Sequence, residues 1–361
     1  MDRKDIIVCF PHIGNYAYAF RYLMENGFGV SYLIPPPITK KTLEIGGKYS
    51  PDYVCVPFKY CLGTYIEALE LGANCLAQIY GECRLEYYGE LQEQLLRDMG
   101  YEFMFFNMAE IKWSSPKSIM KNLKIINPDV SIAKVVAAAP TTIRIIKALD
   151  KFEDFIRRNV GFEVVNGEFD KTYNEFLAKL AKANDGKTVK ALIVEYWNAL
   201  NAIKTDKPKN TLKIGFVGDY YTVQEPFSNH FMEKELAKFG MEVYRKMNFS
   251  CTIIHNENKR KRDYAKDYVK FDIGATANST IAEAMEFARS GCDGVIHVKS
   301  FGCMPENDAT PILQRVSDDL HIPILHFSFD SQTSETGVKT RLEAFYDMIE
   351  VRKAGERSKA V

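Results

Sequence analysis

Short apolar runs alternate with amphipathic helical patterns through the first third of this chain. The apolar runs are rich in β-branched and aromatic residues, which is typical of buried strands. They lie at residues 5–10, 30–34, 53–56, 75–80 and 101–106. Residues 63–72 and 85–99, between these runs, repeat apolar positions at helical spacing. Alternation of strands and helices in this way predicts a parallel, doubly wound sheet.

The pattern changes between residues 114 and 208, where amphipathic helices follow one another with almost no strand signal. The polar stretch 204–210 (KTDKPKN) is typical of a linker. Alternation then resumes, with strands expected at 213–218, 241–247, 293–298 and 322–330, and helices near 227–239, 279–289 and 340–351. We therefore predict an α/β protein with two Rossmann-like doubly wound domains, residues 1–113 and 211–361, and a helical region, residues 114–210, between them.

Composition excludes several classes of partner. Apolar residues make up 46% of the chain and charged residues 26%, as in an ordinary globular protein. Basic and acidic residues balance at 47 each, so no bulk field attracts nucleic acid or an anionic membrane. The first residues are charged, and their apolar run is too short for a signal peptide. No apolar stretch approaches the roughly 20 residues that span a bilayer, so we expect a cytoplasmic protein.

The eight cysteines are the first candidates for chemistry. A cytoplasmic protein keeps its thiols reduced, so structural disulfides are not expected. The chain contains no C-x-x-C motif, which argues against zinc ribbons, thioredoxin-type redox pairs and ferredoxin-type cluster runs. A metal site made of these thiols must therefore gather them from distant parts of the chain.

The predicted fold sorts the cysteines, because ligands of such sheets sit beyond the carboxyl ends of the strands. Cys75 and Cys292 begin their strands, so we expect them to be buried structural thiols. Six others lie at or after strand ends: Cys9, Cys55, Cys61, Cys83, Cys251 and Cys303. Cys9 lies in an apolar run, so packing as a small apolar side chain is favoured for it. For Cys61, expected in a short link before a helix, and for Cys251, packing and a ligand role both stay open. Gly or Pro in the neighbouring loop favours a ligand role for the remaining three.

Four stretches in the two flanking domains together form a recognisable pattern. They are Cys55-Val-Pro57-Phe-Lys59 with Gly63, Cys83, Phe301-Gly-Cys303-Met-Pro305, and Thr340-Arg341-Leu-Glu-Ala-Phe345. Together they resemble the 2-hydroxyacyl-CoA dehydratase-related iron–sulfur proteins, and most of all the activase-related or CoA protein activase branch, which includes double-cubane cluster proteins. The middle of the chain resembles this family only in being helical.

The resemblance implies an anaerobic protein that holds a [4Fe–4S] cluster through thiolates from separate domains. Position by position, the implied ligands are Cys55, Cys83 and Cys303, which would leave one iron open, whereas a ferredoxin cluster takes four thiolates. Some relatives carry a double-cubane cluster held by six thiolates, for which Cys61, Cys251 and Cys9 are the further candidates. Many relatives have a His in the stretch after Lys59, where this chain has Tyr60-Cys61, so the type of cluster stays open.

The resemblance also implies a partner, a separate ATP-hydrolysing activator that delivers a low-potential electron. This chain is not expected to be that activator, because it lacks G-x-G-x-x-G and because Gly186-Lys187-Thr188 follows Ala181 where a P-loop needs Gly. Relatives work as dimers, so we expect a homodimer, with a heterodimer as the alternative. Neither nucleic acid nor membrane is an expected partner.

Charged residues near the expected site supply further candidates. Lys59, Arg84, Lys299 and Arg341 would place cations there, and cations could bind a CoA phosphate. Asp219 follows an expected strand and is a candidate, with Lys59 and Arg341, for substrate binding. His12 is a possible proton donor, although capping or packing is the simpler role.

Three functions remain open on the sequence. The first is an iron–sulfur lyase, a dehydratase that passes the activator's electron to its substrate. The second is a double-cubane reductase component that acts on small molecules. The third is a non-enzymatic binding or assembly protein whose cysteines lie in the core, which the position of the thiols at strand ends disfavours.

Overall fold

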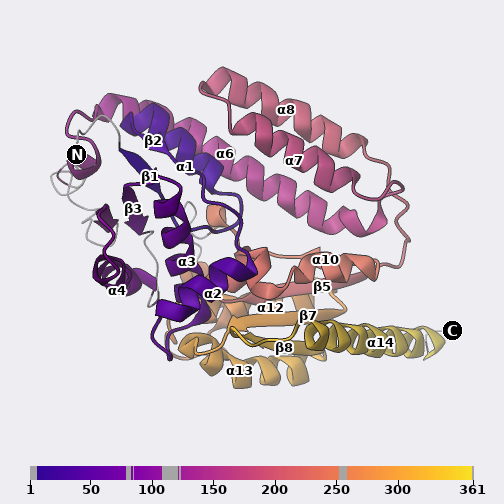
Figure 1. The fold of residues 1–361 in the computed structure, drawn as a ribbon. Helices are drawn as coiled ribbons and strands as arrows, with labels where there is room; N and C mark the ends of the chain where they lie inside the picture. The colour runs from indigo at the N-terminus through magenta and orange to yellow at the C-terminus, as the bar shows by residue number, and fades with distance from the viewer. Residues whose placement is uncertain are drawn as a thin grey trace. The chain divides into compact units, whose positions relative to one another are not determined.

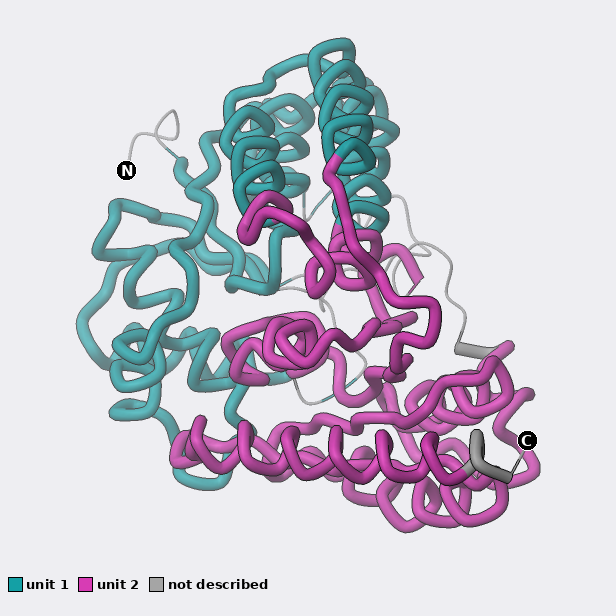
Figure 2. Tube along the Cα trace, turned by 90° about the vertical axis from the view of Figure 1, so that its right-hand side faces the viewer, with its two compact units in different colours: residues 1–152, 170–202 teal, residues 153–169, 203–361 magenta. Residues whose placement is uncertain are grey.

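The chain forms two compact units in the computed structural model, which describes residues 6–78, 83, 85–107, 121, 123–251 and 258–359. The first unit comprises Met1–Phe152 and Asp170–Ala202, and the second comprises Glu153–Phe169 and Ile203–Val361 (Figure 2). Each unit holds one parallel sheet. The domain boundaries expected near residues 113 and 210 remain predictions.

The sheet of the first unit has four parallel strands in the order β2-β1-β3-β4. Its strands are β1 (Ile7–Cys9), β2 (Ser31–Tyr32), β3 (Cys75–Gln78) and β4 (Met104–Asn107). Helices cover both faces (Figure 1), with α1 (Ala17–Leu23) on one, and α3 (Val56–Glu70) and α4 (Leu85–Asp98) on the other. The predicted doubly wound sheet is confirmed for this unit.

The strand predicted at residues 53–56 is wrong. Val56 begins α3, and Cys55 is the N-cap of that helix. Pro57 explains the difference, because its fixed φ suits the first turn of a helix and its missing N–H cannot join a strand ladder. Cys61, expected in a link before a helix, lies inside the same helix and is buried.

Helices fill the middle of the chain, as predicted. They are α6 (Ile132–Asn159), α7 (Glu168–Leu180) and α8 (Gly186–Ala202), and no strand lies among residues 123–202, all of which are described. Phe152 of α6 holds these helices together. Its ring lies 4.9 Å from that of Phe176 in α7 and 5.6 Å from that of Trp197 in α8, centre to centre.

The second sheet repeats the plan of the first, with four parallel strands in the order β6-β5-β7-β8. Its strands are β5 (Leu212–Gly218), β6 (Met241–Tyr244), β7 (Gly294–Ser300) and β8 (Ile324–Phe329). One face packs against α9 (Tyr220–Gln224), α10 (Met232–Lys238) and α14 (Glu335–Lys359), and the other against α11 (Asn258–Ala265), α12 (Ala277–Arg289) and α13 (Met304–Leu320). Two Rossmann-like parallel sheets are therefore confirmed.

Helices of the described chain are too short or too polar to cross a bilayer. The longest, α6, carries charged residues along its length and belongs to the helical bundle.

Candidate functional site

Each sheet has an edge where a ligand site is expected. In an open parallel sheet this is the carboxyl edge, at the point where the chain changes its direction of winding. The strand orders place that point between β1 and β3 in the first sheet and between β5 and β7 in the second. Four predicted site residues follow these strands or begin the helices that connect them: Cys55, Cys83, Asp219 and Cys303.

Cys55 and Cys83 lie at the carboxyl edge of the first sheet. Cys55 is the N-cap of α3, Cys83 lies just before α4, and both are half-buried. Helices that connect parallel strands begin at this edge, because each must run back toward the amino ends of the strands. Sγ of Cys55 lies 3.6 Å from Oη of Tyr88, in the first turn of α4. The N-termini of α3 and α4 therefore lie close together.

Cys303 occupies the corresponding position in the second unit. It is the half-buried N-cap of α13, directly after Gly302, whose φ of 82° turns the chain away from β7. The local sequence is the same at both helix starts. Cys55-Val56-Pro57 and Cys303-Met304-Pro305 each put a cysteine at the N-cap and a proline in the first turn. The dipole at a helix N-terminus stabilises negative charge, so both positions favour a thiolate.

Asp219 holds the loop that carries Cys303. It is buried at the end of β5, where Oδ1 accepts a hydrogen bond from the backbone N–H of Thr222 at 2.9 Å. Oδ2 accepts from the N–H of Ser300 at 2.6 Å, which ties β5 to the end of β7. Burial raises the pKa of Asp219 despite these two bonds. Both carboxylate oxygens therefore accept hydrogen bonds from the backbone, and substrate binding by Asp219 stays a prediction.

Glu306, His297 and His326 form a polar network below the same loop, and sequence reasoning missed all three. Nε2 of His297 lies 2.9 Å from Oε2 of Glu306, and Nδ1 of His297 lies 2.9 Å from Nδ1 of His326. His297 and Glu306 are fully buried. Alternating polar residues in the sequences of β7 (GVIHVKS) and β8 (ILHFSF) were the available signal.

Cationic side chains surround part of this network. Lys299, two residues after His297, donates a hydrogen bond to Asn307, and burial lowers the pKa of Lys299. Arg341 of α14 donates to the backbone oxygen of His326 at 2.6 Å. In the first unit Lys59 lies half-buried one turn into α3. Arg84 lies outside the described residues.

The other cysteines differ in burial and chemistry. Burial raises the pKa of Cys9 to about 12, and its thiol donates to the backbone oxygen of Phe10 at 3.3 Å. Burial likewise raises the pKa of Cys75 to about 12 and of Cys292 to about 11. Cys75 is the first residue of β3 and is fully buried, as predicted, whereas Cys292 is half-buried. Without a metal, these three thiols therefore favour the protonated form at neutral pH, and a ligand role for Cys9 stays a prediction.

Two further candidates, Cys251 and His12, lie beyond strand ends. Cys251 is half-buried beyond the end of β6, and its backbone N–H donates to Oδ1 of Asn248 at 2.8 Å. His12 is half-buried just beyond the end of β1, at the carboxyl edge of the first sheet. The described contacts assign no chemistry to either.

Across the described part of the chain, no group of three His, Cys, Asp or Glu residues lies close enough to hold a metal ion. Cys55 and Cys83 belong to the first unit and Cys303 to the second, so a ligand set that combines them stays a prediction. The donors themselves suit an iron–sulfur cluster, because Cys55 and Cys303 sit at helix N-termini and all three are half-buried near sheet edges.

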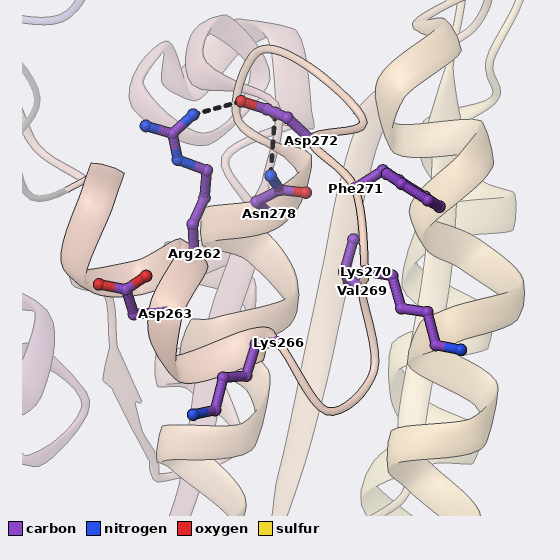
Figure 3. A pocket seen from close by; sticks show the side chains of 8 residues that line it. All are labelled: Arg262, Asp263, Lys266, Val269, Lys270, Phe271, Asp272 and Asn278. Carbon is purple, nitrogen blue, oxygen red and sulfur yellow. Dashed lines mark hydrogen bonds and ion pairs between the residues drawn. The ribbon is translucent and has the colours of Figure 1, made fainter.

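One pocket lies between α11 and the loop that precedes α12 (Figure 3). Arg262 pairs with Asp272 across it, and Nδ2 of Asn278 donates to Oδ1 of the same aspartate at 2.9 Å. These bonds close the turn before α12 and offset the positive charge of Arg262. None of the eight residues that line this pocket is a predicted site residue.

Comparison with known families identifies the chain. The family model of the 2-hydroxyglutaryl-CoA dehydratase D-component matches residues 159–349, more than half of the chain. No curated protein matches it. The matched span contains the whole second sheet, the Cys303 loop and Arg341. With the two parallel sheets, this match confirms the resemblance first seen in the cysteine-bearing loops, and the chain belongs to the 2-hydroxyglutaryl-CoA dehydratase D-component family.

Proposed function

We propose that this chain is an iron–sulfur component of a 2-hydroxyacyl-CoA dehydratase, whose cluster is held by Cys55, Cys83 and Cys303. Family members are generally iron–sulfur proteins that work with a separate activator. The observation that carries the proposal is the repeated Cys-x-Pro at the N-termini of α3 and α13. It supports a thiolate donor in each unit at the sheet edge where ligands bind.

The bound cluster would supply the electron that allows the hydroxyl group of a 2-hydroxyacyl thioester to leave. The residues of the chain have the other tasks. The helix dipoles of α3 and α13 stabilise the thiolates, and Asp219 holds the loop of Cys303 in place. Lys299 and Arg341 offer positive charge near His326 of β8, which favours a substrate with anionic groups.

A separate ATP-dependent activator would deliver the electron, because this chain carries neither a P-loop nor a dinucleotide fingerprint. We therefore expect little reduction of the iron by a mild donor alone, and strong reduction once activator and ATP are added under anaerobic conditions. The measurement is the electron paramagnetic resonance signal of the reduced protein. Equal reduction with and without the activator would exclude this gated route.

Iron content after anaerobic purification tests the ligand set. We expect about four iron and four sulfide per chain for one cubane, whereas about eight of each would favour a double cubane. Cys55→Ser, Cys83→Ser and Cys303→Ser should each lose most of the iron. Cys292→Ser is the matched control, because its raised pKa argues against a thiolate role, and it should keep the iron. If the Cys303→Ser variant retains its iron, Cys303 is not a ligand of the cluster and the proposed ligand set is wrong.

A further inference from the structure

A column of polar side chains lies between β7, β8 and α13. His297 of β7 is directly opposite His326 of β8 in the parallel register, so both side chains point to the same face of the sheet. Glu306, in the first turn of α13, approaches His297 from above that face. Three elements distant in sequence thus bring one carboxylate and two imidazoles into line.

Hydrogen bonds set the charge at the inner end of the column. Oε1 of Glu306 accepts from the hydroxyl of Thr276 at 2.8 Å and lies 3.0 Å from that of Thr280. Oε1 thus acts as an acceptor, and a carboxylate without a hydrogen can only accept hydrogen bonds. Nε2 of His297, 2.9 Å from Oε2, must then carry a hydrogen. The other charges near Glu306 are Lys299 and Asp219.

The proton positions follow outward from Glu306. A neutral His297 with its hydrogen on Nε2 has a lone pair on Nδ1, which accepts from Nδ1–H of His326 at 2.9 Å. Nε2 of His326 is then a free base. This atom is buried and has no hydrogen-bond partner among the residues that the structure describes. A buried acceptor without a partner is costly unless a ligand supplies the donor.

The surroundings keep His326 neutral and suit an anion. Burial is the largest cause that lowers the pKa of His326 to about 4, and the positive charges of Lys299 and Arg341 act in the same direction. Lys299 lies on the same face of β7 as His297, and Arg341 binds the backbone oxygen of His326. A neutral base beside two cations can take a proton from a ligand and leave the resulting anion stabilised.

We propose that Glu306, His297 and His326 form a proton relay that serves a hydroxyl-bearing ligand beside His326 in β8. The ligand O–H gives its proton to Nε2 of His326, and Nδ1–H of His326 passes a proton to Nδ1 of His297. Nε2–H of His297 then passes a proton to Oε2 of Glu306. The relay ends with neutral Glu306, two neutral imidazoles in the opposite tautomer, and the ligand anion beside Lys299 and Arg341. The reverse sequence returns the proton to the ligand oxygen.

The identity of the ligand rests on the proposed function, which makes it a 2-hydroxyacyl thioester whose 2-hydroxyl group carries the exchangeable proton. His326 would be the catalytic residue of the relay. Glu306 and His297 would be positioning residues that act through it. The tautomer of each histidine can be measured without substrate, so the relay is testable even if the thioester is the wrong ligand.

Nitrogen-15 NMR of histidine-labelled protein reads the tautomers directly. We expect hydrogen on Nε2 of His297 and on Nδ1 of His326 at pH 7. In Glu306→Gln the threonine donors should hold the amide oxygen and turn the NH2 group toward His297, which reverses both tautomers. Asp308→Asn, an exposed change on the same helix, is the control and should leave them unchanged. Identical tautomers in wild type and Glu306→Gln, or a charged His326 at pH 7, would overturn the relay.

Kinetics separate the relay from the cluster. With 2-hydroxyglutaryl-CoA, the activator and ATP, Glu306→Gln should keep its iron but lose kcat by about 100-fold or more, with a smaller change in KM. His326→Phe, at the less buried end of the relay, gives a second variant with the same expectation. Normal kcat in both variants would overturn the relay. A wild-type protein that holds iron but does not turn over this thioester would contradict the proposed function. The NMR measurement of the histidine tautomers would still test the relay in that case.

Discussion

Side chains of the same type differ in protonation in this protein, according to their burial and their nearest charges. Cys75 is fully buried and keeps its proton, while Cys303 is half-buried at a helix N-terminus that favours the thiolate. His326 is held neutral by burial and neighbouring positive charge. Residue type alone therefore does not assign a role; the local dielectric and the nearest charges do.

We expect His326 to make stability fall with acid. Its pKa is lowered to about 4 in the folded protein from the ordinary value of 6.5, so the unfolded chain binds the proton more tightly. The neutral side chain therefore contributes stability that is present above pH 6.5 and is lost as the pH falls toward 4. Urea unfolding between pH 7.5 and 5 measures this slope, and His326→Gln should flatten it.

His321 supplies the control for that measurement. It is exposed at the end of α13 in the left-handed conformation, which asparagine tolerates. His321→Asn removes one histidine without touching the relay, so it should keep the slope of the wild type. The same slope in the wild type and in His326→Gln would contradict the assignment.

Helices α2 (Lys40–Tyr49) and α3 approach each other backbone to backbone, and this contact positions Cys55. A Cβ added to Gly46 would lie 1.8 Å from the backbone oxygen of Lys59. A Cβ added to Gly63 would lie 2.1 Å from that of Thr42. Neither contact can relax without moving a helix, since each meets main-chain atoms. These glycines therefore hold α3 in place.

We expect Gly46→Ala to lower the free energy of unfolding by about 2–3 kcal/mol and to reduce iron retention, because α3 must move. Gly47→Ala is a closely matched control. It lies in the same helix, and its added Cβ would come no closer than 4.0 Å to Cδ of Lys59. Its helix propensity should leave stability unchanged or raise it by up to about 1 kcal/mol. Urea unfolding distinguishes the two, and equal effects would argue against the helix contact.

The whole molecule is built from units that are discontinuous in sequence. Residues 153–169 belong to the second unit, although they precede its sheet by some 40 residues. Arg157 lies 2.9 Å from Oε1 of Glu233, which also pairs with Arg245 at 3.0 Å. Burial alone would raise the pKa of Glu233, but the two arginines outweigh it and hold that pKa low. The end of α6 is thus part of the second unit's core.

We therefore expect a fragment of residues 203–361 to unfold at lower urea concentration than the same fragment mixed with a peptide of residues 153–169. The peptide restores the Arg157 ion pair and the packing at Gly161, where a Cβ would meet the backbone oxygen of Ala237 at 2.4 Å. A peptide with Arg157→Ala should not stabilise the fragment, because Glu233 loses one of its two buried partners. If the urea midpoint of the fragment is the same with and without the wild-type peptide, this division of the chain is wrong.

Local patterns were sufficient for most of the architecture. All eight described strands correspond to apolar runs predicted within a few residues, and β8 lies inside the run at 322–330. Apolar runs and helical periodicities depend on neighbours in sequence, which is why they could be read directly. The strand expected at 53–56 failed where a single proline outweighed the β-branched residues around it.

The sequence by itself determined two parallel α/β sheets, a helical middle and a family resemblance carried by Cys55, Cys83 and Cys303. Only the tertiary structure decided that Cys9 and Cys61 are buried, and that Asp219 braces the loop of Cys303. It alone set His297 opposite His326 and brought Glu306 onto the same face. Strand register, burial and proton position depend on residues far apart in the chain, and no local pattern records which of them will meet.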